Sequence, residues 1–148
     1  MDFGMIGLGL ARMTLMAWND EMTVGVKAMD DDHKRLIEIL NEMQEAIAAG
    51  DDRKILGAAL ERLVEYTKGH LAREEKLLAQ CDYPDSTEHH KEHDAMIAKA
   101  LIAQANFRVG SSEMLTIEMM NFLSDWLTEH IQGSDRLYGP YLNSHGIH

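Results

Sequence analysis

Four segments with helical periodicity, each carrying a histidine in line with its apolar positions, constrain the fold of this chain more than any other feature. The segments are expected at about residues 31–49, 52–80, 87–109 and 111–138. Glycines at positions 50 and 110 mark the ends of the first and third segments, because glycine commonly follows the last residue of a helix. The connections are short, so neighbouring helices should run antiparallel. The sequence therefore predicts an all-α fold, an antiparallel up-down-up-down four-helix bundle.

The inward-facing stripe of each segment follows from steps of three and four residues along it. In chain order the stripes are His33, Leu36, Leu40, Met43 and Ile47; Leu56, Leu60, Leu63, Thr67, His70, Glu74, Leu77 and Cys81; His89, His93, Met96, Ala100, Ala103 and Phe107; and Met119, Leu123, Trp126 and His130. The histidines lie near the starts of the first and third segments and near the ends of the second and fourth. Antiparallel packing joins these ends, so all five histidines should converge at one end of the core.

This convergence points to a metal site. A buried imidazole needs partners for its ring nitrogens, and a buried carboxylate such as Glu74 is costly unless it is paired or bound to metal. Imidazole and carboxylate ligands without a thiolate suit iron, manganese, zinc or copper. The Glu-x-x-His pattern of carboxylate-rich di-iron sites is absent, because His70 and Glu74, like His89 and His93, are four residues apart. The predicted site is therefore rich in histidine.

Asp135 is a further candidate ligand, five residues after His130. In a regular α-helix, five residues place it about 140° away from the histidine stripe. Taken alone, Asp135 is better explained as a solvated surface acid. A local widening toward π-type turns near Gly133 would swing it back toward the core, and beside so many candidate ligands we interpret it as one of them.

Several of these motifs match one known family. They are "HKRL" at residues 33–36, His70 with Glu74, "YP" followed by His89 and His93, and "WLTEHIQGSD" at residues 126–135. The stretch "VGVKAMDDDHKRL", which follows Trp18, and the closing "YGPYLNSHGI" extend the match over residues 18–147. In these features the chain resembles the hemerythrins, and most closely the bacterial single-domain hemerythrins.

The resemblance implies a non-haem centre of two Fe ions with an oxo or hydroxo bridge. Its seven implied ligands are His33, His70, Glu74, His89, His93, His130 and Asp135. Glu74, Asp135 and the solvent bridge would each serve both irons. His89, His93 and His130 would complete one iron, while His33 and His70 would leave the other iron with an open position for O2.

Two further residues are expected to line an O2 pocket. Leu127 lies three residues before His130, almost one helical turn, and Trp126 is its neighbour in sequence. Side chains lean toward the N-terminus of their helix, so Leu127 can project over the O2 side of the site. Its position in "WLTEH" also resembles the residue that screens the bound gas in the family. The alternative is that Leu127 is an ordinary core residue.

Composition and charge limit the other functions of the chain. The net charge of −11 argues against nucleic-acid binding, which needs basic surfaces. Residues 1–17 are apolar but too short and interrupted to span a bilayer. They are expected to form an N-terminal arm before a domain at residues 18–148, with membrane contact as the minority alternative. Cys81 is the single cysteine, so nothing requires an oxidising compartment, and a cytoplasmic location is expected.

The expected function is reversible O2 binding, in transport, storage or sensing, and not enzymatic catalysis. A di-iron oxidase or peroxidase that uses the same open position is one alternative. Iron storage or metal buffering is another. The sequence has no substrate-pocket signature and no electron-donor domain, which disfavours an enzyme, and it identifies no protein partner.

Overall fold

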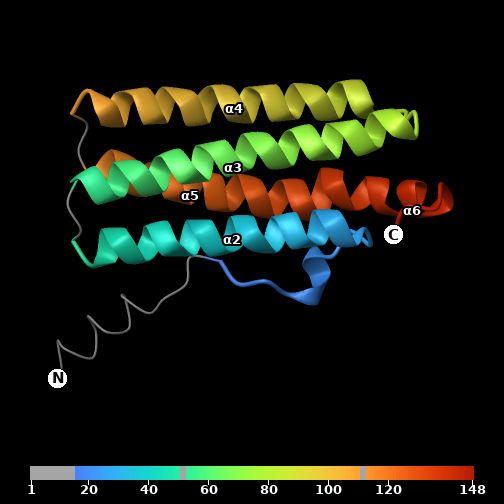
Figure 1. The fold of residues 1–148 in the computed structure, drawn as a ribbon, viewed down its shortest axis with the longest axis horizontal. Helices are drawn as coiled ribbons and strands as arrows, with labels where there is room; N and C mark the ends of the chain where they lie inside the picture. Colours follow the sequence, from blue (N-terminus) through green and yellow to red (C-terminus); the bar gives the residue numbers. More distant parts are fainter. Residues whose placement is uncertain (1–15, 51–52, 111–112) are drawn as a thin grey trace.

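Four long helices lie side by side in the computed structural model, which describes residues 16–50, 53–110 and 113–148 (Figure 1). They are α2 (Lys27–Ala48), α3 (Arg53–Gln80), α4 (Ser86–Arg108) and α5 (Glu113–His130). Each helix packs against the next along the chain, and α5 also packs against α2, which closes the bundle. The described residues form no strand. The predicted all-α, up-down-up-down bundle is confirmed.

The first helix begins at Lys27, four residues before the expected start. The side chain of Asp30 accepts a hydrogen bond from the amide of Val24 (2.8 Å) and one from the hydroxyl of Thr23 (2.5 Å). These two hydrogen bonds hold residues 23–24 against the first turn of α2. Met29 in the first turn is buried, so packing favours the added turn.

The last helix continues beyond residue 138, where the sequence predicted its end. A π-helical turn, η2 (Ile131–Asp135), follows α5 directly, and α6 (Arg136–Ser144) follows η2 with Pro140 inside it. Tyr138 and Leu142 are fully buried. A Cβ atom at Gly139 would lie 1.9 Å from the carbonyl oxygen of Val24, so only glycine allows this close approach. Tertiary packing here overrides the poor helix propensity of Gly and Pro.

The hydrophobic core runs along the bundle between the four helices. Its buried members include Leu36, Leu40, Met43, Leu60, Leu63, Met96, Met120 and Leu123. Most of the predicted inward positions are therefore confirmed. Trp126 is only half-buried, and the side chain of Met119 lies outside what the structure describes.

The segment before α2 packs along the bundle. Met16 is buried, its amide donates to Oδ1 of Asn41 (3.1 Å), and its carbonyl accepts from Nδ2 of the same side chain (2.8 Å). A short 3-10 helix, η1 (Asp20–Met22), follows. Residues 1–15 of the expected arm lie outside the described residues, whereas Met16, also assigned to that arm, is part of the packed structure.

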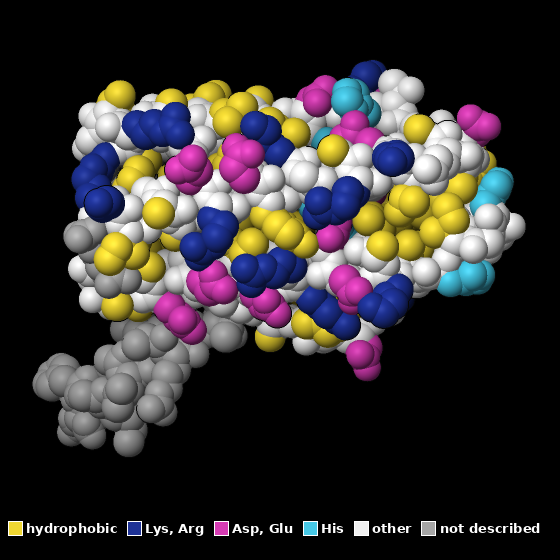
Figure 2. Space-filling model, in the orientation of Figure 1, with side chains coloured by type: hydrophobic (Ala, Val, Ile, Leu, Met, Phe, Trp, Pro, Cys, Tyr) yellow, Lys and Arg dark blue, Asp and Glu magenta, His cyan; other side chains and the backbone are white. Residues whose placement is uncertain are grey.

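Acidic and basic side chains are interspersed on the face of the molecule in Figure 2, and its histidines appear only toward the end that holds the C-terminus. The three histidines outside the core, His90, His145 and His148, are exposed. Among the described residues, no helix is both long enough and apolar enough to cross a membrane.

Candidate metal centre

Seven polar side chains meet at one end of the bundle core. They are His33 of α2, His70 and Glu74 of α3, His89 and His93 of α4, His130 of α5 and Asp135 of η2. None of them is more than 5% exposed. The structure therefore brings together all seven residues that the sequence singled out, from four helices and the π turn.

The π turn explains how Asp135 reaches the core. A π turn closes i→i+5 hydrogen bonds and accommodates one more residue than an α turn. Asp135 consequently returns to the face of His130, and its Oδ1 lies 2.9 Å from Nε2 of that histidine. The predicted departure from α geometry near Gly133 is confirmed.

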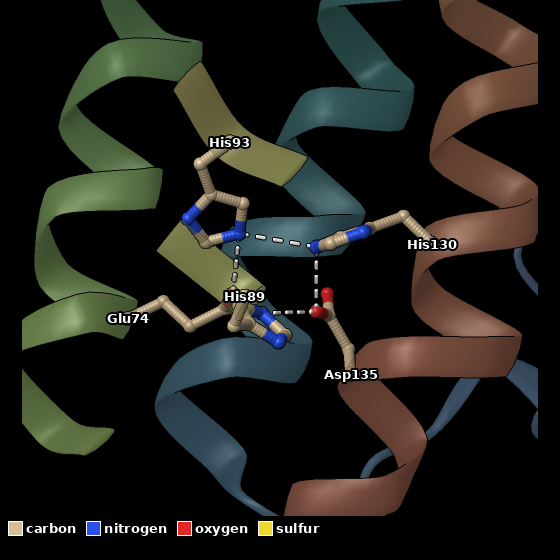
Figure 3. Close-up of side chains that lie close together, drawn as sticks. All are labelled: Glu74, His89, His93, His130 and Asp135. Carbon is tan, nitrogen blue, oxygen red and sulfur yellow. Dashed lines mark hydrogen bonds and ion pairs between the residues drawn. The ribbon is translucent and has the colours of Figure 1, made fainter. Parts of the chain in front are cut away.

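The seven side chains form two overlapping groups, and the candidate ligand atoms of each group lie within 4.8 Å of one another. The larger group is Glu74, His89, His93, His130 and Asp135 (Figure 3). The smaller group is His33, His70, Glu74 and Asp135. Both carboxylates belong to both groups, so three imidazoles surround them on one side and two on the other.

The Nε2 atoms of the histidines point toward the two carboxylates. Nε2 of His89 lies 2.6 Å from Oε1 of Glu74 and 3.0 Å from Oδ1 of Asp135. Nε2 of His93 lies 2.9 Å from Oε1 of Glu74. In Figure 3, His89 and His93 approach from α4, opposite His130 and Asp135. With Nε2 of His130, five candidate ligand atoms thus surround one small volume.

An outer set of side chains holds the seven side chains of the cluster in place. Two carboxylates accept from Nδ1 atoms: Asp32 from His70 (2.9 Å) and Glu75 from His93 (2.9 Å). A third carboxylate, Glu92, forms an ion pair with His130, with Oε2 3.0 Å from Nδ1. The hydroxyl of Tyr138 donates to Oε2 of Glu74 (2.8 Å). Such partners fix the tautomer and the ring orientation of a metal-binding histidine. Sequence reasoning missed these four residues, although each of the three acids is next in sequence to a candidate ligand.

The carboxylates of the cluster are ionised despite their burial. Burial raises the pKa of Glu74, but contacts with His89 and His93 outweigh it and lower the pKa to about 2. Burial also opposes ionisation of Asp135, and contacts with His130 and other histidines hold its pKa well below the ordinary value. Desolvation lowers the pKa of His89, but Asp135 and Glu74 raise it to about 10. The two carboxylates therefore need positive charge beside them, which protons or metal ions can supply.

Within the described part of the chain, four buried side-chain atoms have no hydrogen-bond partner: Nδ1 and Nε2 of His33 and both carboxylate oxygens of Asp135. Nε2 of His33 lies 3.1 Å from Oδ2 of Asp135, but not in hydrogen-bonding geometry. The Nε2 atoms of His93 and His130 face each other at 3.1 Å. Buried polar atoms without partners are costly, and imidazoles facing carboxylates are a donor set that transition metals take. The residues present fit a centre of two metal ions.

A small cavity adjoins the cluster on the side of His70. Its volume is about 20 Å³, enough for one small molecule. His70, His130 and Asp135 form its polar end, and apolar side chains that include Trp126 and Leu127 form most of the rest. Leu127 is buried, and the Trp126 indole stacks on the His130 imidazole with ring centroids 4.3 Å apart. Both predicted pocket residues therefore line a cavity beside the cluster.

Comparisons with known proteins find a matching family model, similar proteins and similar solved structures. Residues 24–142 match the family model of the hemerythrin HHE cation binding domain. A bacteriohemerythrin of Stenotrophomonas maltophilia (strain R551-3) is 32% identical over 133 residues, which cover 90% of this chain and 85% of that protein. A hemerythrin-like protein of Naegleria gruberi is 30% identical over 121 residues, 82% of this chain and 88% of that protein. The crystal structure of a wild-type hemerythrin superposes with a TM-score of 0.79 at 31% identity, covering 86% of this chain and 98% of that chain.

Proposed function

The chain belongs to the hemerythrin family, and from this premise we propose that it binds O2 reversibly at a non-haem di-iron centre. The observation that carries the proposal is the unequal division of the cluster. Glu74 and Asp135 belong to both groups, with three histidines in one group and two in the other. An oxygen-binding centre needs this asymmetry, because one metal must keep a position free for the gas.

The proposed ligand set is the seven buried residues. Glu74, Asp135 and an oxo or hydroxo bridge would serve both irons. His89, His93 and His130 would then complete six ligands on one iron. His33 and His70 would bring the other to five, and the cavity that His70 lines together with His130 and Asp135 would adjoin its open position. Two irons held by these ligands would supply the electrons that bind O2.

The residues of the chain control access to this position. The cavity walls are mainly apolar side chains, with Leu127 among them. An apolar wall admits O2 and excludes water and protons, which favours reversible binding over loss of the gas as a reduced product. Trp126 holds the His130 ring by stacking, and Asp32 holds the His70 ring through Nδ1.

The alternative functions of the same centre would require a different cavity. A di-iron oxidase or peroxidase would need room for a second substrate, and a cavity of about 20 Å³ favours a small gas. Iron storage or metal buffering would need no apolar cavity. We therefore favour transport, storage or sensing of O2 in a cytoplasmic setting, with no catalytic turnover.

An optical experiment tests this proposal. The iron-loaded protein is reduced without air, exposed to O2, and then flushed with argon. We expect an absorption band that appears with O2 and disappears under argon, in protein that holds about two irons per chain. Zinc-loaded protein is the control and should show no band. A band that never reverses, with accumulation of an oxidised product, would favour the oxidase; one zinc and no iron after anaerobic loading would refute the di-iron centre.

A further inference from the structure

His130 and His89 each lie beside a hollow in the surface of the molecule. A hollow of about 250 Å³ is lined by Glu92, Trp126, Glu129, His130 and Ser134. A second hollow of about 150 Å³ reaches His89, and Glu92 and Ser134 line this hollow too. Of the five core histidines, His89 and His130 are the most accessible, at 4% and 5%. Two of the three histidines in the larger group are thus the core histidines nearest to solvent.

Trp126 connects this surface to the cluster. Its indole is half-buried, and its ring plane lies 14° from that of the His130 imidazole. The Trp126 side chain lines both the larger hollow and the cavity beside His70. Electron transfer falls steeply with distance, so two stacked rings form a short path from solvent to the proposed iron. A partner in the hollow would reach this path without entering the cavity.

The surface around the hollows is acidic. Glu129 is exposed, Glu92 is 45% exposed at its side chain, and Glu88 lies at the edge of the second hollow. Two lysines of α4 near this surface are engaged in contacts of their own. Lys91 forms an ion pair with Glu88 (3.2 Å), and Lys99, two turns beyond Glu92, lies over the ring of Phe122. The whole chain carries a net charge of −11. A complementary partner therefore presents a positively charged face.

We propose that this acidic face, defined by Glu88, Glu92, Trp126 and Glu129, is the docking surface for a basic one-electron donor protein that re-reduces the oxidised centre. The inference rests on the proposed di-iron function. Two donor molecules each lose one electron, both irons pass from Fe(III) to Fe(II), and the bridging oxygen takes up one proton from solvent.

A matched pair of double variants tests the surface. The ferric protein is mixed at low salt with hexaammineruthenium(II), a cationic one-electron donor, and reduction is followed by stopped flow. Glu88→Gln with Glu129→Gln removes two charges from the acidic face but leaves Glu92, which contacts His130. Glu61→Gln with Glu118→Gln removes two exposed charges nearer the opposite end of the bundle. We expect the first variant to react about tenfold more slowly, the lower end of electrostatic steering, and the second to react like wild type.

A binding measurement separates this inference from O2 binding. In Trp18→Phe protein, Trp126 is the remaining tryptophan, and its fluorescence is titrated with hexaamminecobalt(III). We expect saturable quenching that the acidic-face variant weakens and the control variant does not. Equal rates and equal quenching in the two double variants would overturn the docking surface, even if O2 binds reversibly. Selective loss of quenching in a protein that fails to bind O2 would support the surface and refute the proposed function.

Discussion

Asp32 organises one side of the cluster through three contacts. Its Oδ2 accepts from Nδ1 of His70 (2.9 Å) and from Nε of Arg73 (2.9 Å), and its Oδ1 accepts from the hydroxyl of Tyr66 (3.0 Å). Burial raises the pKa of Asp32, but the bonds from His70 and Arg73 outweigh it and hold the pKa far below its ordinary value. A permanently ionised acid thus fixes the ring that faces the proposed gas position.

Leu127 is the residue whose replacement tests the gas cavity most directly. Leu127→Ala enlarges the cavity and opens its apolar wall, so water and protons should reach the O2 position more easily. We expect the variant to keep its iron and bind O2, yet to autoxidise faster than wild type. The rate is measured from the decay of the oxygenated spectrum at matched iron content.

Leu60→Ala is a suitable control for this experiment. Leu60 is buried in α3 but does not line the cavity. Each substitution should cost about 2–5 kcal/mol of stability, as for other buried leucines. If both variants autoxidise like wild type, Leu127 is an ordinary core residue.

At the scale of elements, the π turn determines whether Asp135 reaches the cluster. A π turn is equivalent to one residue added to an α-helix. Deleting Gly133 would put Asp135 four residues after His130, within about 40° of its face in a regular α-helix. Inserting an alanine after Gly133 would place it six residues away, about 120° off that face. We expect the deletion variant to bind two irons and the insertion variant to lose them, by elemental analysis of folded protein.

Gly133 itself is free to change, which makes a third variant informative. Apart from its chain neighbours and the backbone of its own helix, no atom lies within 4 Å of a Cβ built at this position, so Gly133→Ala should keep the fold and the iron. Iron retained by the insertion variant would show that Asp135 is dispensable as a ligand.

The same elements show what sequence reasoning could and could not reach. Apolar periodicity reports which face of a helix is buried, so the bundle and the inward histidines could be predicted. Regular α geometry places Asp135 off that face, and only its neighbours suggested the widened turn. Asp32 was missed because its partner His70 is 38 residues away on another helix. Such a contact depends on how two helices are rotated against each other, which local periodicity does not encode.

At the scale of the whole molecule, the chain before Met16 should be dispensable for the centre. Met16 is anchored by two bonds to Asn41, and the ligand set begins at His33. We expect deletion of residues 1–15 to leave iron content and O2 binding unchanged. Deletion of residues 1–17 also removes the Met16 anchor and should lower the unfolding midpoint in urea. A folded protein without residues 1–15 that fails to load iron would show that the arm takes part in the site.

The charged cluster predicts how the stability of the iron-free protein varies with pH. The folded pKa of Glu74, about 2, lies below its ordinary 4.5, so its contribution is present above pH 4.5 and is lost as the pH falls toward 2. The folded pKa of His89, about 10, lies above its ordinary 6.5. Its contribution is complete below pH 6.5 and is lost as the pH rises toward 10. The iron-free protein should therefore be most stable between these two ordinary values.

Bound iron should reverse the loss of stability above pH 6.5, because histidine must lose its proton to bind a metal ion. Between pH 6.5 and 8.5, the free energy of unfolding of the iron-free protein should fall by up to about 1.4 kcal/mol per pH unit for His89 alone. The free energy of unfolding of the iron-loaded protein should stay constant or rise over the same pH range. Urea unfolding of both forms measures the difference, with His148→Gln as a control because His148 is exposed and outside the cluster. Parallel curves for the two forms would mean that iron displaces no protons from the histidines, and the proposed ligand set would then be wrong.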